Sequence, residues 1–347
     1  MIASLALLML GATRLLSMTG VAGLARAIAM VGVALALTGI IQQSMFTGWI
    51  YGFWPQSGGS PYGPFINKNH FAGWMLMGLP VTLGLLCSGL TRGLRGVGNG
   101  WRDRALWLAS PHASEVLLVG GAAAIMTLSL ILTMSRSGML SASCAVVAIA
   151  VLVVRRAATR ARRLIAIAML VAIPVLVIGR AGPGTIAARF TSADVNDLNG
   201  RLGPWQDAIR IARRYPLVGT GFNTYGQATL FYQSFNPSVH YAQAHNDYLQ
   251  LAAEGGWLLS VPAAVCVGLL VIAIRRRFKE ETSESTYWIR AGATTGIAAM
   301  AVQELVEFSL QMPGNAFLFV VLCAIALHRQ PERRHVGAGF PGARVPA

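Results

Sequence analysis

The sequence predicts an all-α, polytopic integral membrane protein with about 8–9 transmembrane helices and one long periplasmic loop that contains a short amphipathic helix. Of its 347 residues, 54% are hydrophobic and 12% are charged, whereas soluble domains carry about 25% charged residues. The apolar residues fall in uncharged stretches that are long enough to cross a bilayer as helices. Arginines gather between these stretches, so the net charge of +15 indicates cytoplasmic loops rather than a nucleic-acid-binding surface.

The whole chain, 1–347, is predicted to form a single membrane domain. Its first apolar run, 2–13, is broken by Arg14 too early for a full span, so only a partial span is expected there. The full spans are predicted near residues 20–45, 70–90, 114–134, 138–154, 164–180, 250–274, 288–310 and 313–328.

Four basic segments set the predicted orientation of these spans. They are 91–113, 155–163, 275–279 and the tail 329–347. The four segments alternate correctly with the spans between them, so all are predicted to face the cytoplasm. The opposite, external face then holds the aromatic loop 46–70 and the segment 181–247. The second of these is longer than a connection needs to be, and such loops are usually functional.

Within the long loop, "GPWQDAIRIARRYP" (203–216) predicts a short helix that Pro204 opens and Pro216 ends. One face is predicted to be apolar, and it comprises Trp205, Ala208, Ile209 and Ala212. The other face carries Asp207, Arg210 and Arg214. We expect this helix to lie along the membrane surface with its arginines toward headgroups or a ligand.

Four polar residues elsewhere lie at or inside the predicted membrane region. Arg136 follows the end of a span in "LTMSRSGML", and Arg201 precedes the surface helix in "NGRLGPW". Glu304 and Glu307 lie three residues apart in a predicted span, and therefore on one helical face. Arg136 also fits a snorkelling side chain, Arg201 a solvated loop charge, and the two carboxylates a structural pairing with an arginine.

The stretch "YAQAHNDYLQLAAEGG" (241–256) places His245, Asn246 and Asp247 directly before an apolar run. Either Asn246 or Asp247 suits the cap of the helix that follows. A metal site from His240, His245 and Asp247 has suitable ligand types, but the spacing matches no established pattern. All four cysteines lie in apolar stretches without metal-ligand spacing, so neither a metal nor a cofactor is expected.

The stretch "NGRLGPWQDAIRIARRYPLVGTGFNTYG…AHNDYLQLAAEGG" resembles the O-antigen ligase and Wzy-type polymerase superfamily. The shared order is an Arg before a Trp-containing helix, then P-L-x-G-x-G, then H-N-x-Y-L and E-x-G. The stretch "GPFINKNHFAGWMLMGLP" (63–80) resembles the family's G-x-F-x-N-x-N element, and "TMSRSG" (133–138) its S-R turn. "LVEFSLQMPGNAF" (305–317) is similar to the closing helix pair, where related sequences often have Asp at the position of Glu307. The resemblance covers about residues 60–328, and family members usually carry several more spans at the amino terminus.

This resemblance implies transfer of a glycan from undecaprenyl diphosphate to a sugar or protein hydroxyl, such as that of a lipid A core. The reaction would occur at the periplasmic face of the bacterial inner membrane, and its partners would be this donor, the acceptor and membrane lipids, without nucleic acid. Arg136 and Arg201 match the family's two important arginines, and we expect them to stabilise the diphosphate because arginine forks suit phosphate oxygens without a metal. His245 matches the family's H-N position, and we expect it to act as the general base, a task for which histidine is suited near neutral pH.

The remaining candidates have supporting roles. The predicted substrate-binding residues are Lys68, Asn69, Arg210, Arg214 and Asn246, and the predicted structural residues are Asp247, Glu304 and Glu307. Three functions stay open at this point. A ligase and a Wzy-type polymerase would use much the same residues, and a small-anion transporter would require ionisable residues near the membrane midplane.

Overall fold

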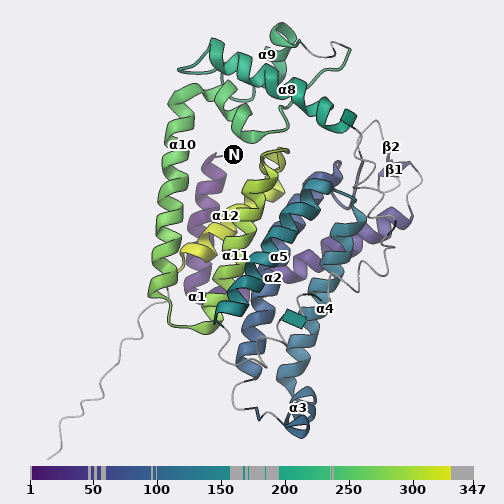
Figure 1. Ribbon diagram of the computed structural model, residues 1–347, viewed down its shortest axis with the longest axis vertical. Helices are drawn as coiled ribbons and strands as arrows, with labels where there is room; N and C mark the ends of the chain where they lie inside the picture. Colours follow the sequence, from purple (N-terminus) through teal and green to yellow (C-terminus); the bar gives the residue numbers. More distant parts are fainter. Residues whose placement is uncertain are drawn as a thin grey trace, which may run out of the picture.

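The computed structural model describes residues 2–45, 48–50, 53–55, 60–94, 97–98, 100–156, 167–168, 171, 184, 195–234, 236 and 238–329. The described chain is mostly helical (Figure 1). Its long helices are α1 (Ile2–Ser44), α2 (Lys68–Gly93), α4 (Pro111–Leu132), α5 (Arg136–Arg156), α8 (Val195–Arg214), α10 (Asp247–Glu280), α11 (Glu284–Gln303) and α12 (Pro313–Leu327). Its short elements are α3 (Trp101–Leu108), α9 (Tyr225–Tyr232), the 3₁₀ turn η1 (Ser309–Gln311) and the antiparallel strands β1 (Trp49–Ile50) and β2 (Trp54–Pro55).

The fold is that of an all-α, multi-pass membrane protein. Among the described residues, five helices are long and apolar enough to cross a membrane: α1, α2, α4, α5 and α10. A shorter apolar helix, α12, coincides with the predicted span 313–328. The predicted span 164–180 and most of the basic loop 155–163 lie outside the described residues.

Helix α2 forms the centre of the bundle, and its membrane-crossing stretch is buried throughout. It packs most extensively on α11, at places where glycine allows the two backbones to approach each other. A Cβ atom at Gly84 would lie 2.4 Å from the carbonyl oxygen of Trp288, and one at Gly292 would lie 2.3 Å from that of Pro80. Small residues at such crossings permit the close van der Waals packing that joins helices in lipid.

Helix α1 has two arms that meet at Gly20 and run in different directions (Figure 1). Gly20 has φ 69° and ψ 168°, a conformation that only glycine adopts without strain. The expectation that the first partial span ends at Arg14 is therefore wrong, because the helix continues through Arg14, whereas the turn at Gly20 coincides with the start of the predicted span 20–45.

The basic segments that are described gather at one end of the bundle. The Arg277 side chain at the end of α10 donates a hydrogen bond to the carbonyl oxygen of Leu327 at the end of α12. Buried Arg290, near the start of α11, donates to the carbonyl oxygens of Ala326 and Arg277 and pairs with Glu281. These contacts place the carboxyl ends of α10 and α12 beside the amino end of α11, and the assignment of this end to the cytoplasm stays a prediction.

At the opposite end, α8 and α9 cover the bundle (Figure 1). Helix α8 begins at Val195 and includes Pro204, so the prediction that Pro204 opens the helix is wrong. The expected division of its faces is also partly wrong. Ala208 is buried, but Ile209 is exposed and Asp207 is buried. The Asp207 carboxylate accepts hydrogen bonds from the backbone and hydroxyl of Ser234, which explains why a charged residue occupies the inner face.

Candidate functional site

The site is built where α11 ends and α10 begins. The expectation that Glu304 and Glu307 share one helical face is wrong, because α11 ends at Gln303 and both carboxylates lie in the connection to η1. The backbone N–H of Asp247 donates to the carbonyl oxygen of Glu304 at 3.1 Å, and the Asn246 side chain donates to that of Leu305 at 2.8 Å. The start of α10 thus replaces the hydrogen bonds that a longer α11 would have made.

Glu307 joins its own segment to α8 and to the start of α2. Its Oε1 accepts a hydrogen bond of 2.6 Å from Nη2 of Arg201 and another of 2.7 Å from Nδ2 of Asn69. The Glu307 side chain is 0% exposed, whereas that of Arg201 is 22% exposed. A fully buried carboxylate needs such charge-assisted partners. Glu307 therefore fixes where the guanidinium of α8 lies relative to the start of α2.

His245 lies on the other side of the same carboxylate. Its Nδ1 is 3.7 Å from Oε2 of Glu307, and both atoms are buried without a hydrogen-bond partner among the described residues. The imidazole also packs edge-on against the Phe308 ring, with centroids 4.9 Å apart. A hydrogen on Nδ1 would point toward the carboxylate, and this tautomer would leave Nε2 as the basic nitrogen.

The backbone of His245 has an uncommon conformation. Its φ is 51°, which is in the left-handed region that residues other than glycine rarely adopt. The indole Nε1 of Trp205 donates a hydrogen bond of 3.2 Å to the His245 carbonyl oxygen, and the next residue caps α10. Such strain persists only where neighbouring contacts hold the backbone in place, and it gathers at functional sites.

Asn246 and Asp247 are engaged by the protein. The Asn246 side chain caps α10 by accepting from the backbone of Leu249, and its amide donates to Leu305. Asp247 accepts a hydrogen bond of 2.7 Å from Gln311. Its carboxyl group also lies beside that of Glu304. The hydrogen bonds from Asn246 and from the Asp247 backbone fasten the start of α10 to the end of α11.

Glu254 is a buried carboxylate whose role the sequence reasoning missed. It accepts hydrogen bonds from the backbone N–H groups of Asn223 and Tyr225 and from the Gln250 side chain, and so it holds the start of α9. Its place in the E-x-G motif could have identified it from the sequence. In α9 itself, burial raises the pKa of Tyr225, and the Asp207 carboxylate adds to this effect. The Tyr225 hydroxyl donates to the carbonyl oxygen of Pro204, which joins α9 to α8.

The glycines of the P-L-x-G-x-G and E-x-G motifs join the loop to α10. The helix is interrupted at Gly256, where φ is 53°, and the N–H groups of Trp257 and Leu258 donate to the carbonyl oxygens of Pro216 and Leu217. Gly219 has φ 63°, and a Cβ there would lie 2.2 Å from the backbone of Glu254. The loop therefore fills the break in α10, and only glycine fits at these contacts.

Arg136 and Lys68 begin helices at the same end of the bundle. Arg136 is the first residue of α5, and Lys68 is the first residue of α2. The two helix starts are adjacent, because a Cβ at Gly138 would lie 2.5 Å from that of Ala72. Ser309 contacts the same turn of α2 at Gly73, so Arg136 lies on the side of the bundle that carries Glu307. Binding of substrate by Arg136 and Lys68 stays a prediction.

His70 was not selected from the sequence. Its Nδ1 lies 3.3 Å from the Ser309 hydroxyl, and its ring packs edge-on against Phe308 with centroids 4.6 Å apart. Phe308 therefore lies between His70 and His245. A histidine inside an apolar helix could have drawn attention to this position. The sequence does not show, however, that the segment after α11 packs against His70.

The two candidate arginines near the end of α8 have different surroundings. Arg210 donates to the Tyr232 carbonyl oxygen and the Ser234 hydroxyl, each at 2.9 Å, and lies 3.4 Å from Asp207. These contacts fasten the end of α9 to α8. Arg214 is exposed at the end of α8. Substrate binding by either residue remains a prediction.

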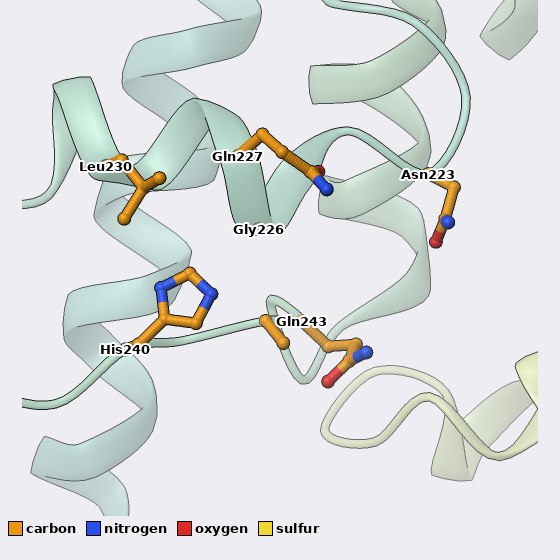
Figure 2. Close-up of a pocket in the computed structure, with 7 residues that line it drawn as sticks. Asn223, Gly226, Gln227, Leu230, His240 and Gln243 are labelled. Atoms are coloured by element: carbon orange, nitrogen blue, oxygen red, sulfur yellow. The ribbon is translucent and has the colours of Figure 1, made fainter.

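A hollow of about 340 Å³ opens beside this site, between α9 and the segment before His245 (Figure 2). Asn223, Gln227, His240 and Gln243 supply its polar side chains, and Leu230 its apolar one. Among the described residues, no group of three or more His, Cys, Asp and Glu side chains is arranged to hold a metal ion. His240 lines the hollow, whereas Asp247 bonds to Gln311, so the two are engaged in different places.

Taken together, these contacts define a multi-pass helical membrane protein with a buried carboxylate that orients an arginine, an amide and a histidine at one end of its bundle. Residues 121–264 match the family described as O-antigen ligase, a range that includes Arg136, Arg201 and His245. The resemblance to the O-antigen ligase superfamily is thereby confirmed.

A curated relative supports this result. The chain is 30% identical over 112 residues to a protein from Acinetobacter baylyi named General O-oligosaccharyltransferase. The match covers 32% of this chain and 18% of that relative, so the chain spans less than two thirds of the relative's length. No solved structure gives a significant match. Family and relative thus agree with each other.

Proposed function

We propose that this protein transfers a glycan from a lipid diphosphate carrier, such as undecaprenyl diphosphate, to a hydroxyl acceptor at the periplasmic face of the bacterial inner membrane. The observation that carries the proposal is the position of Glu307, whose two oxygens face Arg201 and His245. One carboxylate thus orients a group suited to phosphate and a group suited to proton transfer. The name of the Acinetobacter relative, an O-oligosaccharyltransferase, supports an oxygen acceptor.

In the proposed reaction, the acceptor oxygen attacks the anomeric carbon of the donor sugar and its proton passes to Nε2 of His245. The bond between the anomeric carbon and the diphosphate oxygen breaks, and the diphosphate leaves with the bonding electrons. Glu307 stabilises the imidazolium that forms, because its Oε2 lies 3.7 Å from Nδ1. This distance would have to shorten to a hydrogen bond when the substrates bind.

Arg201 and Arg136 are proposed to stabilise the charge that develops on the diphosphate. Arg201 is suited to this task because only one contact of its guanidinium, from Nη2 to Glu307, is found among the described residues. The planar fork can then bind two phosphate oxygens at once. We propose that these protein cations perform the task without a metal ion.

The decisive test is transfer by the purified full-length protein in lipid nanodiscs. A lipid-diphosphate-linked oligosaccharide is supplied with a hydroxyl acceptor, and the products are resolved by mass spectrometry, with and without EDTA. We expect glycan on the acceptor, free lipid diphosphate in equal amount, and no effect of EDTA. Extension of the lipid-linked glycan itself would instead identify a polymerase. Failure to consume any donor would contradict the proposal.

A further inference from the structure

The hollow beside His245 is lined by neutral polar groups. The side chains of Asn223, Gln227, His240 and Gln243 surround it, and no Lys, Arg, Asp or Glu takes part in its lining (Figure 2). Diphosphate binding requires cationic or strongly donating groups, so this lining does not suit the charged part of a donor. Amides offer a donor and an acceptor each, which is what neighbouring sugar hydroxyls require.

The polar side chains of the hollow are not used to stabilise the fold. Among the described residues, neither the amides of Gln227 and Gln243 nor the imidazole of His240 has a hydrogen-bond partner in the protein, and His240 and Gln227 are exposed. The Leu230 side chain, which is 69% exposed, adds an apolar surface at the rim. A sugar ring presents hydroxyl groups at its edge and C–H groups on its faces, so both kinds of surface would be satisfied by one ring.

The backbone around the hollow is arranged for close approach. Gly226 faces the segment 240–243, and a Cβ there would lie 3.2 Å from the Cα of Ala242 and 3.6 Å from Nε2 of His240. A side chain at this position would therefore press into the wall of the hollow. The start of α9 is also held from behind, because the buried Glu254 carboxylate accepts from the N–H group of Asn223. The lining is thus supported by buried contacts.

The hollow is close to the proposed reaction centre. Gln243 precedes His245 by two residues, so their Cα atoms are at most about 7 Å apart. Ala244 between them is buried, and its N–H donates to the Gln250 side chain of α10, which fixes the path of the backbone. The segment that forms one wall of the hollow therefore leads directly into the proposed base.

We propose that this hollow is a subsite for a neutral sugar ring, belonging either to the donor glycan or to a sugar acceptor, and that Gln227 and Gln243 recognise its hydroxyl groups. The role of this subsite in catalysis rests on the proposed function. Binding of a sugar to the hollow, however, can be measured without any transfer reaction. The amides of Gln227 and Gln243 distinguish sugars by the arrangement of their hydroxyl groups, whereas Arg201 and Arg136 hold the diphosphate.

The first experiment measures binding by saturation-transfer NMR on the full-length protein in nanodiscs. The probes are glucose, galactose, mannose, rhamnose, N-acetylglucosamine and N-acetylgalactosamine. We expect at least one sugar to receive saturation from the wild type and from Gln206→Leu, a control that removes an exposed amide of α8 outside the hollow. The double variant Gln227→Leu/Gln243→Leu should lose the signal while its thermal unfolding midpoint is unchanged. Binding of none of the sugars, or equal binding by the double variant, would overturn the proposal.

The second experiment separates the two sources of the sugar by transfer kinetics. Loss of one neutral hydrogen bond should raise a KM by about three- to tenfold and leave kcat nearly unchanged. A rise confined to the KM of the lipid-linked donor assigns the subsite to the donor glycan, and one confined to the acceptor assigns it to the acceptor. Sugar binding without any transfer would support the subsite and contradict the proposed function. Unchanged KM values for both substrates would overturn the subsite.

Discussion

Arg201 and Glu307 form a hydrogen-bonded ion pair of 2.6 Å although 106 positions separate them in the sequence. The arginine comes from the helix that covers one end of the bundle, and the carboxylate comes from the connection between α11 and η1. The pair therefore joins the covering helix to the bundle. It also sets the position of His245, because the second carboxylate oxygen faces the imidazole.

Glu307→Gln should preserve the fold but reduce transfer by about 10²–10⁴-fold. The amide oxygen can still accept from Arg201 and Asn69. The amide nitrogen, however, would donate to Nδ1 of His245, so that Nε2 would carry the hydrogen and could not act as the base. Transfer and thermal unfolding of the purified variant check this prediction.

Glu307→Ala provides the comparison for that variant. It removes the acceptor for Arg201 and Asn69, so it should lower the unfolding midpoint as well as the transfer rate. If Glu307→Gln transferred glycan at the wild-type rate, the carboxylate would be a structural acceptor only, and the proposed role of its charge would be wrong.

Arg201→Lys and Arg136→Lys should each impair transfer strongly although the charge is kept. Lysine offers a single ammonium group, so it cannot bind two phosphate oxygens with a planar fork. The loss should appear in kcat and in kcat/KM for the donor. The matched control is Arg213→Lys, at an exposed position on α8, which should behave as the wild type. Equal activity of all three variants would show that only surface charge matters.

His245→Asn tests the proposed base with the backbone left in place. Asparagine tolerates the left-handed conformation that His245 adopts at φ 51°, whereas alanine would add strain. We expect transfer to fall by about 10²–10⁴-fold, with the affinity for the lipid diphosphate donor near that of the wild type. Loss of donor binding together with transfer would make His245 a phosphate ligand. Recovery of activity on addition of Zn²⁺ or Mg²⁺ would indicate a metal site.

Gly219→Ala should destabilise the loop that fills the break in α10. The new Cβ would lie 2.2 Å from the backbone of Glu254, and the φ of 63° adds strain for any residue with a side chain. The expected result is faster cleavage of the segment 215–245 in limited proteolysis, together with a lower unfolding midpoint. Gly268→Ala is the control, since no atom lies within 4 Å of a Cβ at that position of α10. Equal proteolysis of both variants would show that the loop adapts easily.

The predicted orientation can be checked with cysteines introduced into a variant that lacks Cys87, Cys144, Cys266 and Cys323. Ser238→Cys, on the exposed loop beside α9, should react with a membrane-impermeant maleimide in spheroplasts. Arg102→Cys, exposed on α3, should react only after the membrane is permeabilised. The reverse pattern would place the candidate site on the cytoplasmic side and exclude a periplasmic reaction.

The membrane helices could be predicted from the sequence because their signal is local. A long uncharged run predicts a helix wherever it lies, and basic residues such as Arg92, Arg156 and Arg277 mark the ends of α2, α5 and α10. The kink in α1 was missed, since Arg14 is the conspicuous residue of that run whereas the turn depends on the backbone of Gly20. A glycine alone does not reveal that conformation.

The site could be predicted in part. The residue types pointed to His245, Arg201 and Glu307, but not to their arrangement around one carboxylate. The end of α11 depends on Asn246, which donates to the carbonyl oxygen of Leu305 although 59 positions separate the two residues in the sequence. No local sequence pattern predicts such a contact. The burial of Asp207 depends in the same way on Ser234. Tertiary contacts override a local pattern in each of these cases.

The break at Gly256 has a consequence for how the protein tolerates different membranes. Below it, the stretch from Trp257 to Glu280 is largely exposed along its apolar side chains, as a lipid-facing span would be. A span adapts to bilayer thickness by changing its tilt. The helix is fastened to the loop on both sides of the glycine, because Trp257 and Leu258 donate to Pro216 and Leu217, so a change of tilt has to be absorbed beyond Leu258. Hydrophobic mismatch would then tilt the span beyond Leu258 while the imidazole of His245 keeps its place.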